Sequence, residues 1–200
     1  MKCVLVGDNT VGKTSLILAQ VTGEDLHEYI PSIYQRPNHH HHEEPDTSVE
    51  VDGRNVGLHL WDTVEYNDYD RLRALSYPNT DVFLICFSLE NRISYEDVYS
   101  KWYPEVTRYC PSTPIVLVGL QQDRRNYSRG AWGCAPITRA EGEQLRDDIG
   151  AVQYVECSSW ENKGVLGVFQ AAARAGIDRY NERLSIVVGT KFNVKYCLSQ

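Results

Sequence analysis

The sequence lacks the features that would place a chain in a membrane or outside the cell. No run of about 18 consecutive apolar residues occurs in its 200 residues, so no segment is expected to span a bilayer. The six cysteines form no CxxC pair and no spacing typical of a disulfide framework. Met1-Lys2 leads directly into a short apolar segment rather than into the pattern of a signal peptide. We therefore expect a cytoplasmic protein with reduced, buried thiols.

Positive charge is also scarce. The chain has 20 Lys and Arg against 27 Asp and Glu, which gives a formal net charge of −7 at pH 7. Sequence-independent binding to nucleic acid depends on many basic side chains, so we expect no nucleic-acid partner. Apolar residues make up 42% and charged residues 24%, as is typical of a soluble globular protein. The length suits one α/β domain and is too short for two ordinary ones.

Short β-branched apolar runs alternate along the chain with longer segments of helical pattern. The segments expected to form strands are 3–7, a hairpin over 48–61 that turns at Asp52-Gly53, 82–89, 114–119 and 151–156. The segments expected to form helices are 14–23, 94–106, 138–150 and about 161–183. This order predicts an α/β fold, with a mostly parallel six-stranded sheet and helices on both faces. Ligands of such sheets bind beyond the carboxyl ends of the strands.

The end of the first expected strand carries a phosphate-binding pattern. Gly7-Asp8-Asn9-Thr10-Val11-Gly12-Lys13-Thr14 fits GxxxxGK[ST], between an expected strand and an expected helix. Backbone N–H groups and the positive end of the helix attract phosphate oxygens in such a loop. Lys13 is expected to pair with the β and γ phosphates, and the Thr14 hydroxyl to ligate Mg²⁺. The nucleotide-binding residues predicted here are Gly7, Asn9, Thr10, Val11, Gly12, Lys13, Thr14 and Ser15.

Beyond this loop, the sequence resembles the Rho/Rac family of small GTPases within the Ras superfamily. The resemblance extends from Lys2 to about Arg179 and rests on WDT (61–63), DYDRLRALSYPNTDVFLICFSL (68–89), KWYPEV (101–106), TPIVLVG (113–119), APIT (135–138) and YVECSS (154–159). It implies a P-loop GTPase domain over 1–183 and the cofactors GTP or GDP with Mg²⁺. It also implies effector and exchange-factor partners and a role in actin organisation and cell shape.

The same resemblance implies further site residues. Ser32 lies in the first switch and keeps the hydroxyl that reaches Mg²⁺, while Asp62 is expected to act on the metal through water. Asp123 corresponds to the family's base-reading aspartate. Ser158 and Ser159 lie in the loop that supports the base. For Asp62 and Asp123, a simple turn-capping role at a strand end remains the alternative.

Three departures from the family pattern concern hydrolysis. Tyr66 stands in place of the glutamine that orients the attacking water, and Glu65 stands in place of a glycine. Asn9 adds bulk beside the transferred phosphate. Because a Tyr hydroxyl does not replace an amide at that position, no catalytic residue is predicted and hydrolysis should be very slow or absent. The Glu65 carboxylate would also disfavour GTP relative to GDP unless it swings outward.

The base-binding pattern [NT]KxD is altered as well. The chain has Leu120-Gln121-Gln122-Asp123, so the lysine whose alkyl stem crosses the guanine is replaced by Gln121. The shorter stem should weaken the binding free energy of the nucleotide by about 1–2 kcal/mol, or roughly tenfold in affinity. Nucleotide exchange should therefore be faster.

Two irregular segments interrupt the resemblance. The first, 35–46, is an insertion with four consecutive histidines, His39–His42, for which a solvated loop, a metal site or a gene-modelling artefact are the alternatives. The second, 123–136, is a shortened form of the family's helical insert. Its arginines could contact an acidic partner or form part of a solvated loop.

The tail 184–200 ends in Cys197-Leu198-Ser199-Gln200, which matches C-a-a-X and suggests farnesylation of Cys197. An incidental terminal cysteine is the alternative. With only Lys191 and Lys195 nearby, a single lipid would give marginal, peripheral attachment to the cytoplasmic face of a membrane such as the plasma membrane.

The sequence thus predicts a Rho-type switch that binds guanine nucleotide and hydrolyses GTP poorly. A pseudo-GTPase that binds no nucleotide or a fixed one, acting as an interaction module, is the second hypothesis. An ordinary hydrolysing GTPase is the third.

Overall fold

A six-stranded sheet lies at the centre of the computed structural model, which describes residues 1–23, 45–63, 70–126 and 135–196. The strand order is β2-β3-β1-β4-β5-β6, and only the β2–β3 pair is antiparallel. The strands are β1 (Lys2–Val6), β2 (Thr47–Val51), β3 (Arg54–Asp62), β4 (Val82–Ser88), β5 (Ile115–Leu120) and β6 (Gln153–Glu156). The predicted fold class is confirmed.

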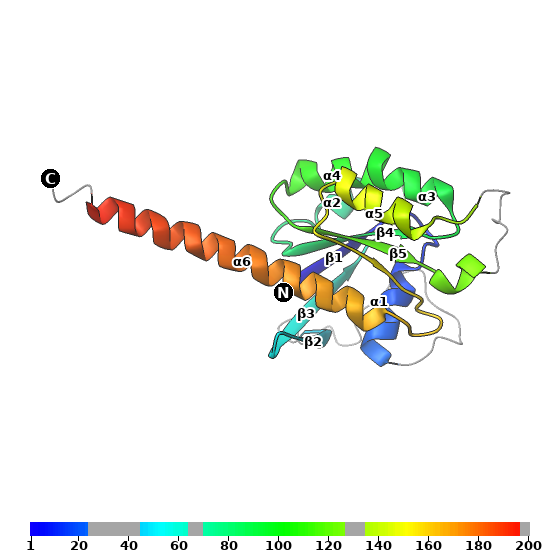
Figure 1. Cartoon of the computed structure of the whole chain (residues 1–200). Helices are drawn as coiled ribbons and strands as arrows, with labels where there is room; N and C mark the ends of the chain where they lie inside the picture. Colours follow the sequence, from blue (N-terminus) through cyan, green and yellow to red (C-terminus); the bar gives the residue numbers. More distant parts are fainter. Residues whose placement is uncertain (24–44, 64–69, 127–134, 197–200) are drawn as a thin grey trace.

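Helices cover both faces of this sheet (Figure 1). They are α1 (Lys13–Thr22), α2 (Asp70–Ala74), α3 (Arg92–Asp97), α4 (Tyr103–Tyr109), α5 (Arg139–Asp148) and α6 (Val165–Tyr196). Alternation along β1 separates two cores: Cys3 and Leu5 pack in the layer with α1 and α6, whereas Val4 and Val6 pack in the layer with Trp102 of the opposite face.

The predicted hairpin forms at the predicted turn. Asp52 and Gly53 both have positive φ, 51° and 74°, and Val51 pairs with Arg54 across the turn. A two-residue turn with both central residues in the left-handed region has the twist that antiparallel strands require. This local signal was sufficient to place β2 beside β3.

The single helix expected over 94–106 is divided in the structure. α3 begins at Arg92 after the Asn91 cap, Val98–Trp102 forms a π-helical turn, and α4 continues to Tyr109. The Tyr103 N–H bonds to the Val98 carbonyl, five residues back. Pro104 has no N–H to donate and lies in the first turn of α4, so the wider turn accommodates it without ending the helix.

The last helix is longer than predicted. α6 begins at Val165 rather than near 161 and continues to Tyr196, well past the expected end at 183. Residues 184–196 include one glycine and no proline, so nothing in the local sequence stops the helix. The domain boundary at 183/184 stays a prediction. None of the helices in the described part of the chain is long and apolar enough to cross a membrane.

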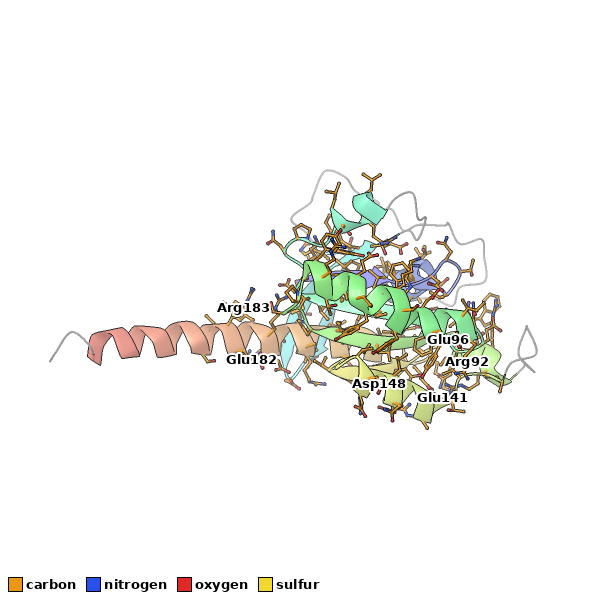
Figure 2. The ribbon with its side chains drawn as sticks, turned by 90° about the horizontal axis from the view of Figure 1, so that it is seen from above. Arg92, Glu96, Glu141, Asp148, Glu182 and Arg183 are labelled. Atoms are coloured by element: carbon orange, nitrogen blue, oxygen red, sulfur yellow. The ribbon has the colours of Figure 1, made fainter. Side chains whose placement is uncertain are left out.

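A capping box begins α5. The Thr138 side chain accepts from the Glu141 N–H, while Glu141 Oε2 accepts from the Thr138 N–H (2.8 Å) and hydroxyl (2.7 Å). Arg92 on α3 donates to the other Glu141 oxygen at 2.7 Å, and Figure 2 shows these two residues close together. The Thr138 hydrogen bonds, supported by Arg92, lower the pKa of Glu141 from 4.5 to about 2.

This lowered pKa predicts a pH-dependent contribution to stability. The folded-state pKa lies below the unfolded one, so the Glu141 carboxylate contributes fully above about pH 4.5 and its contribution is lost as the pH falls towards 2. Glu141→Gln should cost about 0.5–1 kcal/mol at neutral pH, because it removes the charge and keeps an acceptor. Urea unfolding at several pH values would measure this, with Glu143→Gln as the control on the same helix. A difference between wild type and variant that is equal at pH 3 and pH 7 would contradict the assignment.

Candidate functional site

The loop between β1 and α1 lies directly against β4. Gly7 has a φ of 145°, and a Cβ atom at this position would lie 2.2 Å from the backbone oxygen of Cys86. Gly12 is the N-cap of α1 with a φ of 109°. Gly12 has no side chain with which to cap this helix end, and the N-terminus of a helix attracts anionic ligands.

Lys13 extends back over this loop. Its side chain is nearly buried, and Nζ donates to the backbone oxygens of Gly7 (2.6 Å) and Asp8 (2.7 Å). The ammonium is therefore held inside the loop, where the sequence places it. A phosphate bound to the loop N–H groups would meet this charge at close range.

The two predicted metal-binding side chains that the structure describes are in contact. Thr14 on α1 donates its hydroxyl to Asp62 Oδ2 at 2.6 Å, and Asp62 is the last residue of β3. Within the described residues, no group of three or more His, Cys, Asp or Glu could hold a metal ion alone. Mg²⁺ commonly takes only one or two protein oxygens and completes its shell with phosphates and water. Thr14 and Asp62 fit that pattern.

The predicted base-reading residues meet at the ends of β5 and β6. Ser158 donates its hydroxyl to Asp123 Oδ1 at 2.6 Å, and the Gln122 N–H donates to the Cys157 carbonyl at 3.1 Å. Asp123 is thereby held in one orientation at the strand ends. The sequence predicted both Ser158 and Asp123 as site residues, whereas the contact between them is visible only in the folded chain.

Gln121 connects the base end to the phosphate loop. It has a φ of 62°. Its side-chain oxygen accepts from the Ser88 hydroxyl at 2.5 Å, and its Nε2 donates to the Thr10 carbonyl at 3.1 Å. Loops after β1, β4 and β5 therefore meet through one amide, as expected for a site beyond the strand ends.

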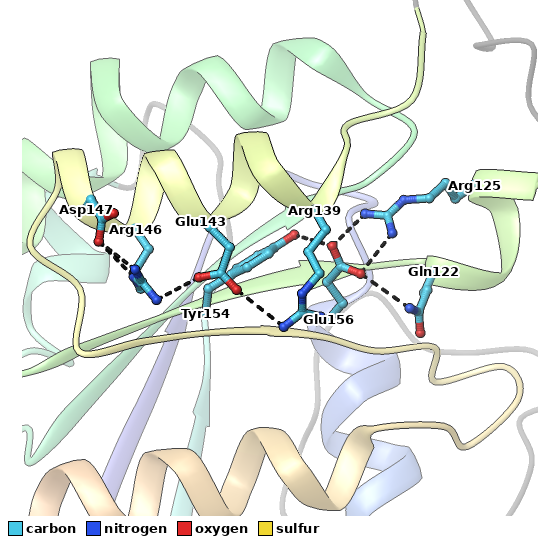
Figure 3. Close-up of polar contacts among 8 residues, drawn as sticks. All are labelled: Gln122, Arg125, Arg139, Glu143, Arg146, Asp147, Tyr154 and Glu156. Atoms are coloured by element: carbon cyan, nitrogen blue, oxygen red, sulfur yellow. Dashed lines mark hydrogen bonds and ion pairs between the residues drawn. The ribbon is translucent and has the colours of Figure 1, made fainter.

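A partly buried ion pair holds the segment that carries Asp123. Arg125, in the 3₁₀-helix Gln122–Asn126, donates to both Glu156 oxygens at 2.8 and 2.6 Å, and the Tyr154 hydroxyl donates to the same carboxylate (Figure 3). Burial by itself would raise the pKa of Glu156, but the hydrogen bonds from Arg125 and Tyr154 outweigh it and hold the pKa below its ordinary value. The ionised pair fixes the 3₁₀-helix against β6.

A cavity joins the base end to the phosphate loop. It has a volume of about 310 Å³ and is lined by Val11, Gly12, Ser15, Leu120, Gln121, Asp123, Arg124, Ser159 and Trp160. Six of these residues were predicted for the site, whereas Leu120, Arg124 and Trp160 were not assigned a role. The signal for Trp160 is its place directly after the predicted base-supporting serines. A second cavity, of about 350 Å³, is lined by α6 and by residues at the amino ends of β5 and β6, away from this site.

A buried network supports the phosphate loop from the opposite layer. Trp102, in the π-helical turn, donates its indole N–H to Asp8 Oδ1 at 2.7 Å. The Arg73 guanidinium lies over the Trp102 ring, 4.8 Å from its centroid. Arg73 pairs with Glu105 through contacts of 2.9 and 2.6 Å, and Glu105 also accepts from the Tyr77 hydroxyl. The network connects the phosphate loop to α2. It was not predicted from the sequence.

Several predicted residues lie outside the described part of the chain. They are Ser32, Glu65, Tyr66, His39–His42 and Cys197. Their predicted roles stay predictions. Asn9 is described and is exposed on the phosphate loop.

Comparison with known families gives one match that includes the whole of this site. A sequence profile of the Ras family matches residues 2–178. The matched range begins at the first residue of β1 and ends within α6, and it contains the phosphate loop, Asp62, Asp123 and the loop after β6.

Proposed function

This chain belongs to the Ras family of small GTPases, and on that premise we propose that it is a Rho-type signalling switch with impaired hydrolysis. The observation that carries the proposal is the convergence of Lys13, Thr14 with Asp62, and Asp123 with Ser158 at one edge of the sheet. A phosphate end, a metal position and a base end lie in the order that a nucleoside di- or triphosphate requires.

Each part of this edge has a chemical role toward guanine nucleotide. The loop N–H groups and the Lys13 ammonium would hold the phosphates, and the Thr14 and Asp62 oxygens would hold Mg²⁺ directly or through water. Bound Mg²⁺ would neutralise part of the phosphate charge. The Asp123 carboxylate accepts hydrogen bonds from the ring N–H and amino group of guanine and rejects adenine, which offers no such pair of donors.

Impaired hydrolysis is proposed from the sequence of the second switch. In the sequence, Tyr66 stands in place of the water-orienting glutamine, and Glu65 stands in place of a glycine, where its carboxylate would oppose the γ-phosphate unless it swings outward. At a separation of about 4 Å, one such charge pair costs about 1 kcal/mol in bulk water and more where water is excluded. Both substitutions, Tyr66 and Glu65, would act on the same step, the hydrolysis of GTP.

The proposed cellular role follows from the Rho resemblance. We propose that the protein acts through effectors on actin organisation and cell shape, is loaded by exchange factors, and is held at the cytoplasmic face of a membrane by a prenyl group on Cys197. The second candidate is a pseudo-GTPase interaction module. It is favoured by Glu65 and by Gln121, which lacks the lysine stem.

The nucleotide released on denaturation separates these functions. The full chain would be purified, denatured and analysed by ion-pair chromatography. GTP supports the proposed switch, and no nucleotide supports the pseudo-GTPase. GDP alone indicates either an ordinary hydrolysing enzyme or a site that Glu65 biases toward GDP.

Restoring the two altered residues should restore hydrolysis. The double substitution Glu65→Gly with Tyr66→Gln is expected to raise the single-turnover rate of GTP hydrolysis by about tenfold or more, because it returns the water-orienting amide and removes the opposing charge. Each single substitution serves as a comparison. A rate that stays at background in the double variant would show that the defect lies elsewhere.

A further inference from the structure

A third cavity lies between α3 and α5, and it shares no lining residue with the cavity at the proposed nucleotide site. It has a volume of about 530 Å³ and is lined by Tyr95, Glu96, Tyr99, Leu145 and Asp148. Leu145 is buried and Tyr95 is partly buried, whereas Tyr99, in the π-helical turn, is 57% exposed. An exposed Tyr ring has an apolar body and a polar tip, which suits contact with another protein. We call this cavity the α3–α5 groove.

The charge that borders the groove is negative. Glu96 on α3 and Asp148 on α5 are both exposed, and Figure 2 shows them on the two helices on either side of the groove. No Lys or Arg is among the described residues that line it. The Gln144 amide donates to Asp148 at 2.8 Å, but neither carboxylate forms an ion pair with any residue that the structure describes. The groove therefore complements a basic partner.

The same two helices already hold one arginine side chain between them. The Arg92 guanidinium lies over the Tyr95 ring, 5.2 Å from its centroid, and donates to Glu141 at 2.7 Å. An arginine of the chain thus joins an aromatic ring of α3 to a carboxylate of α5. Tyr99 lies one helical turn beyond Tyr95 and stacks on Tyr103 with ring centroids 6.5 Å apart. Among the described residues, no basic group from the chain takes the equivalent place at Tyr99.

We propose that the α3–α5 groove binds an arginine-containing segment of a partner protein. The guanidinium groups of that segment pair with Glu96 and Asp148 and lie over Tyr99, and its aliphatic side chains cover Leu145. This interaction goes beyond the proposed function and does not depend on it, because the nucleotide site lies elsewhere. A second copy of this chain is a poorer occupant, because two chains that each carry a formal net charge of −7 repel one another.

Fluorescence anisotropy of a labelled peptide with the full chain tests this surface. The probe is a capped peptide of four arginines, two leucines and one glycine. Wild type should bind it saturably, and the double substitution Glu96→Gln with Asp148→Asn should raise the Kd about fivefold or more, because two ion pairs are lost. Tyr99→Ala should raise the Kd about threefold, whereas Tyr99→Phe keeps the aromatic face and should change it little.

Glu50→Gln with Glu182→Gln is the matched control. It removes the same amount of charge from exposed side chains of β2 and α6, which do not line the groove. An equal loss of affinity in the control and in the groove variant would overturn the inference, because the peptide would then respond only to net charge. The absence of saturable binding with a Kd below about 1 mM would overturn it as well. Light scattering tests the second copy: a dimer that Glu96→Gln with Asp148→Asn disrupts would replace the proposed partner with self-association.

Discussion

Replacing Gly7 with alanine should abolish nucleotide binding and strongly destabilise the fold. An added Cβ would lie 2.2 Å from the Cys86 backbone oxygen, and it would sit on a backbone with a φ of 145°. Gly7 and Cys86 directly follow the last residues of the β1–β4 register, Val6 and Ile85, so a shift of either backbone would strain that pairing. Overpacking and backbone strain each cost about 1–3 kcal/mol, so we expect a loss of about 3–4 kcal/mol in the free energy of unfolding.

Gly23→Ala is the control for this substitution. Gly23 also has a positive φ, 69°, but no described atom lies within 4 Å of the position of its Cβ. The control therefore has backbone strain without the steric clash and should lose only about 1 kcal/mol. Urea unfolding and calorimetric titration with GDP would compare the two. Equal losses would mean that the approach of the loop to β4 is not what requires glycine at residue 7.

Glu105→Gln should be nearly as destabilising, although it keeps the shape of the side chain. The Arg73 side chain is fully buried, and its partner Glu105 is 17% exposed. Burial alone would lower the pKa of Arg73, but the hydrogen bonds and charge of Glu105 outweigh it and keep the pKa above its ordinary value. An arginine guanidinium is effectively always protonated in proteins, so it stays charged after its partner is neutralised. Neutralising one partner of a buried ion pair costs about 3–5 kcal/mol.

In urea unfolding, Glu105→Gln should lower the midpoint concentration and leave unchanged the slope of the unfolding free energy against urea concentration. Glu96→Gln is the control, because Glu96 is an exposed carboxylate on the preceding helix α3 (Figure 2). The double substitution Arg73→Met with Glu105→Leu should recover part of the loss, because it removes both charges. A loss below about 1 kcal/mol in Glu105→Gln would show that water screens the pair.

The effect on nucleotide binding is a separate consequence of the same network. Arg73 lies over Trp102, and Trp102 donates to Asp8 in the phosphate loop. If Glu105→Gln changes the position of Arg73, this variant should therefore also bind GDP more weakly at a temperature where it is fully folded. Trp102 links a loop near the start of the chain to a helix that follows the second switch, so loop geometry and α2 are expected to change together.

The parts of the fold that the sequence predicted are those with local signals. The Asp52-Gly53 turn, the helix predicted over 138–150 and the alternation of strands with helices each depend on a few adjacent residues, and all three are present in the structure, the helix as α5 (Arg139–Asp148). The wrong boundaries arose where a local signal was misleading or missing. The pattern over 94–106 predicted one regular helix and gave no signal for the π-helical turn Val98–Trp102, and residues 184–196 contain no stop signal before Tyr196.

The sequence by itself predicted the chemistry that we propose for this protein: a phosphate loop with its lysine, oxygen ligands for a metal and an acid for the base. Only the tertiary structure decided what holds those groups in place. Asp8 and Trp102 are 94 residues apart, and Arg73 and Glu105 are 32 apart, so no local pattern pairs them. They meet because α2, the π-helical turn and α4 pack together on one face of the sheet beside the loop after β1, and burial there makes each charge depend on the partners that the packing provides.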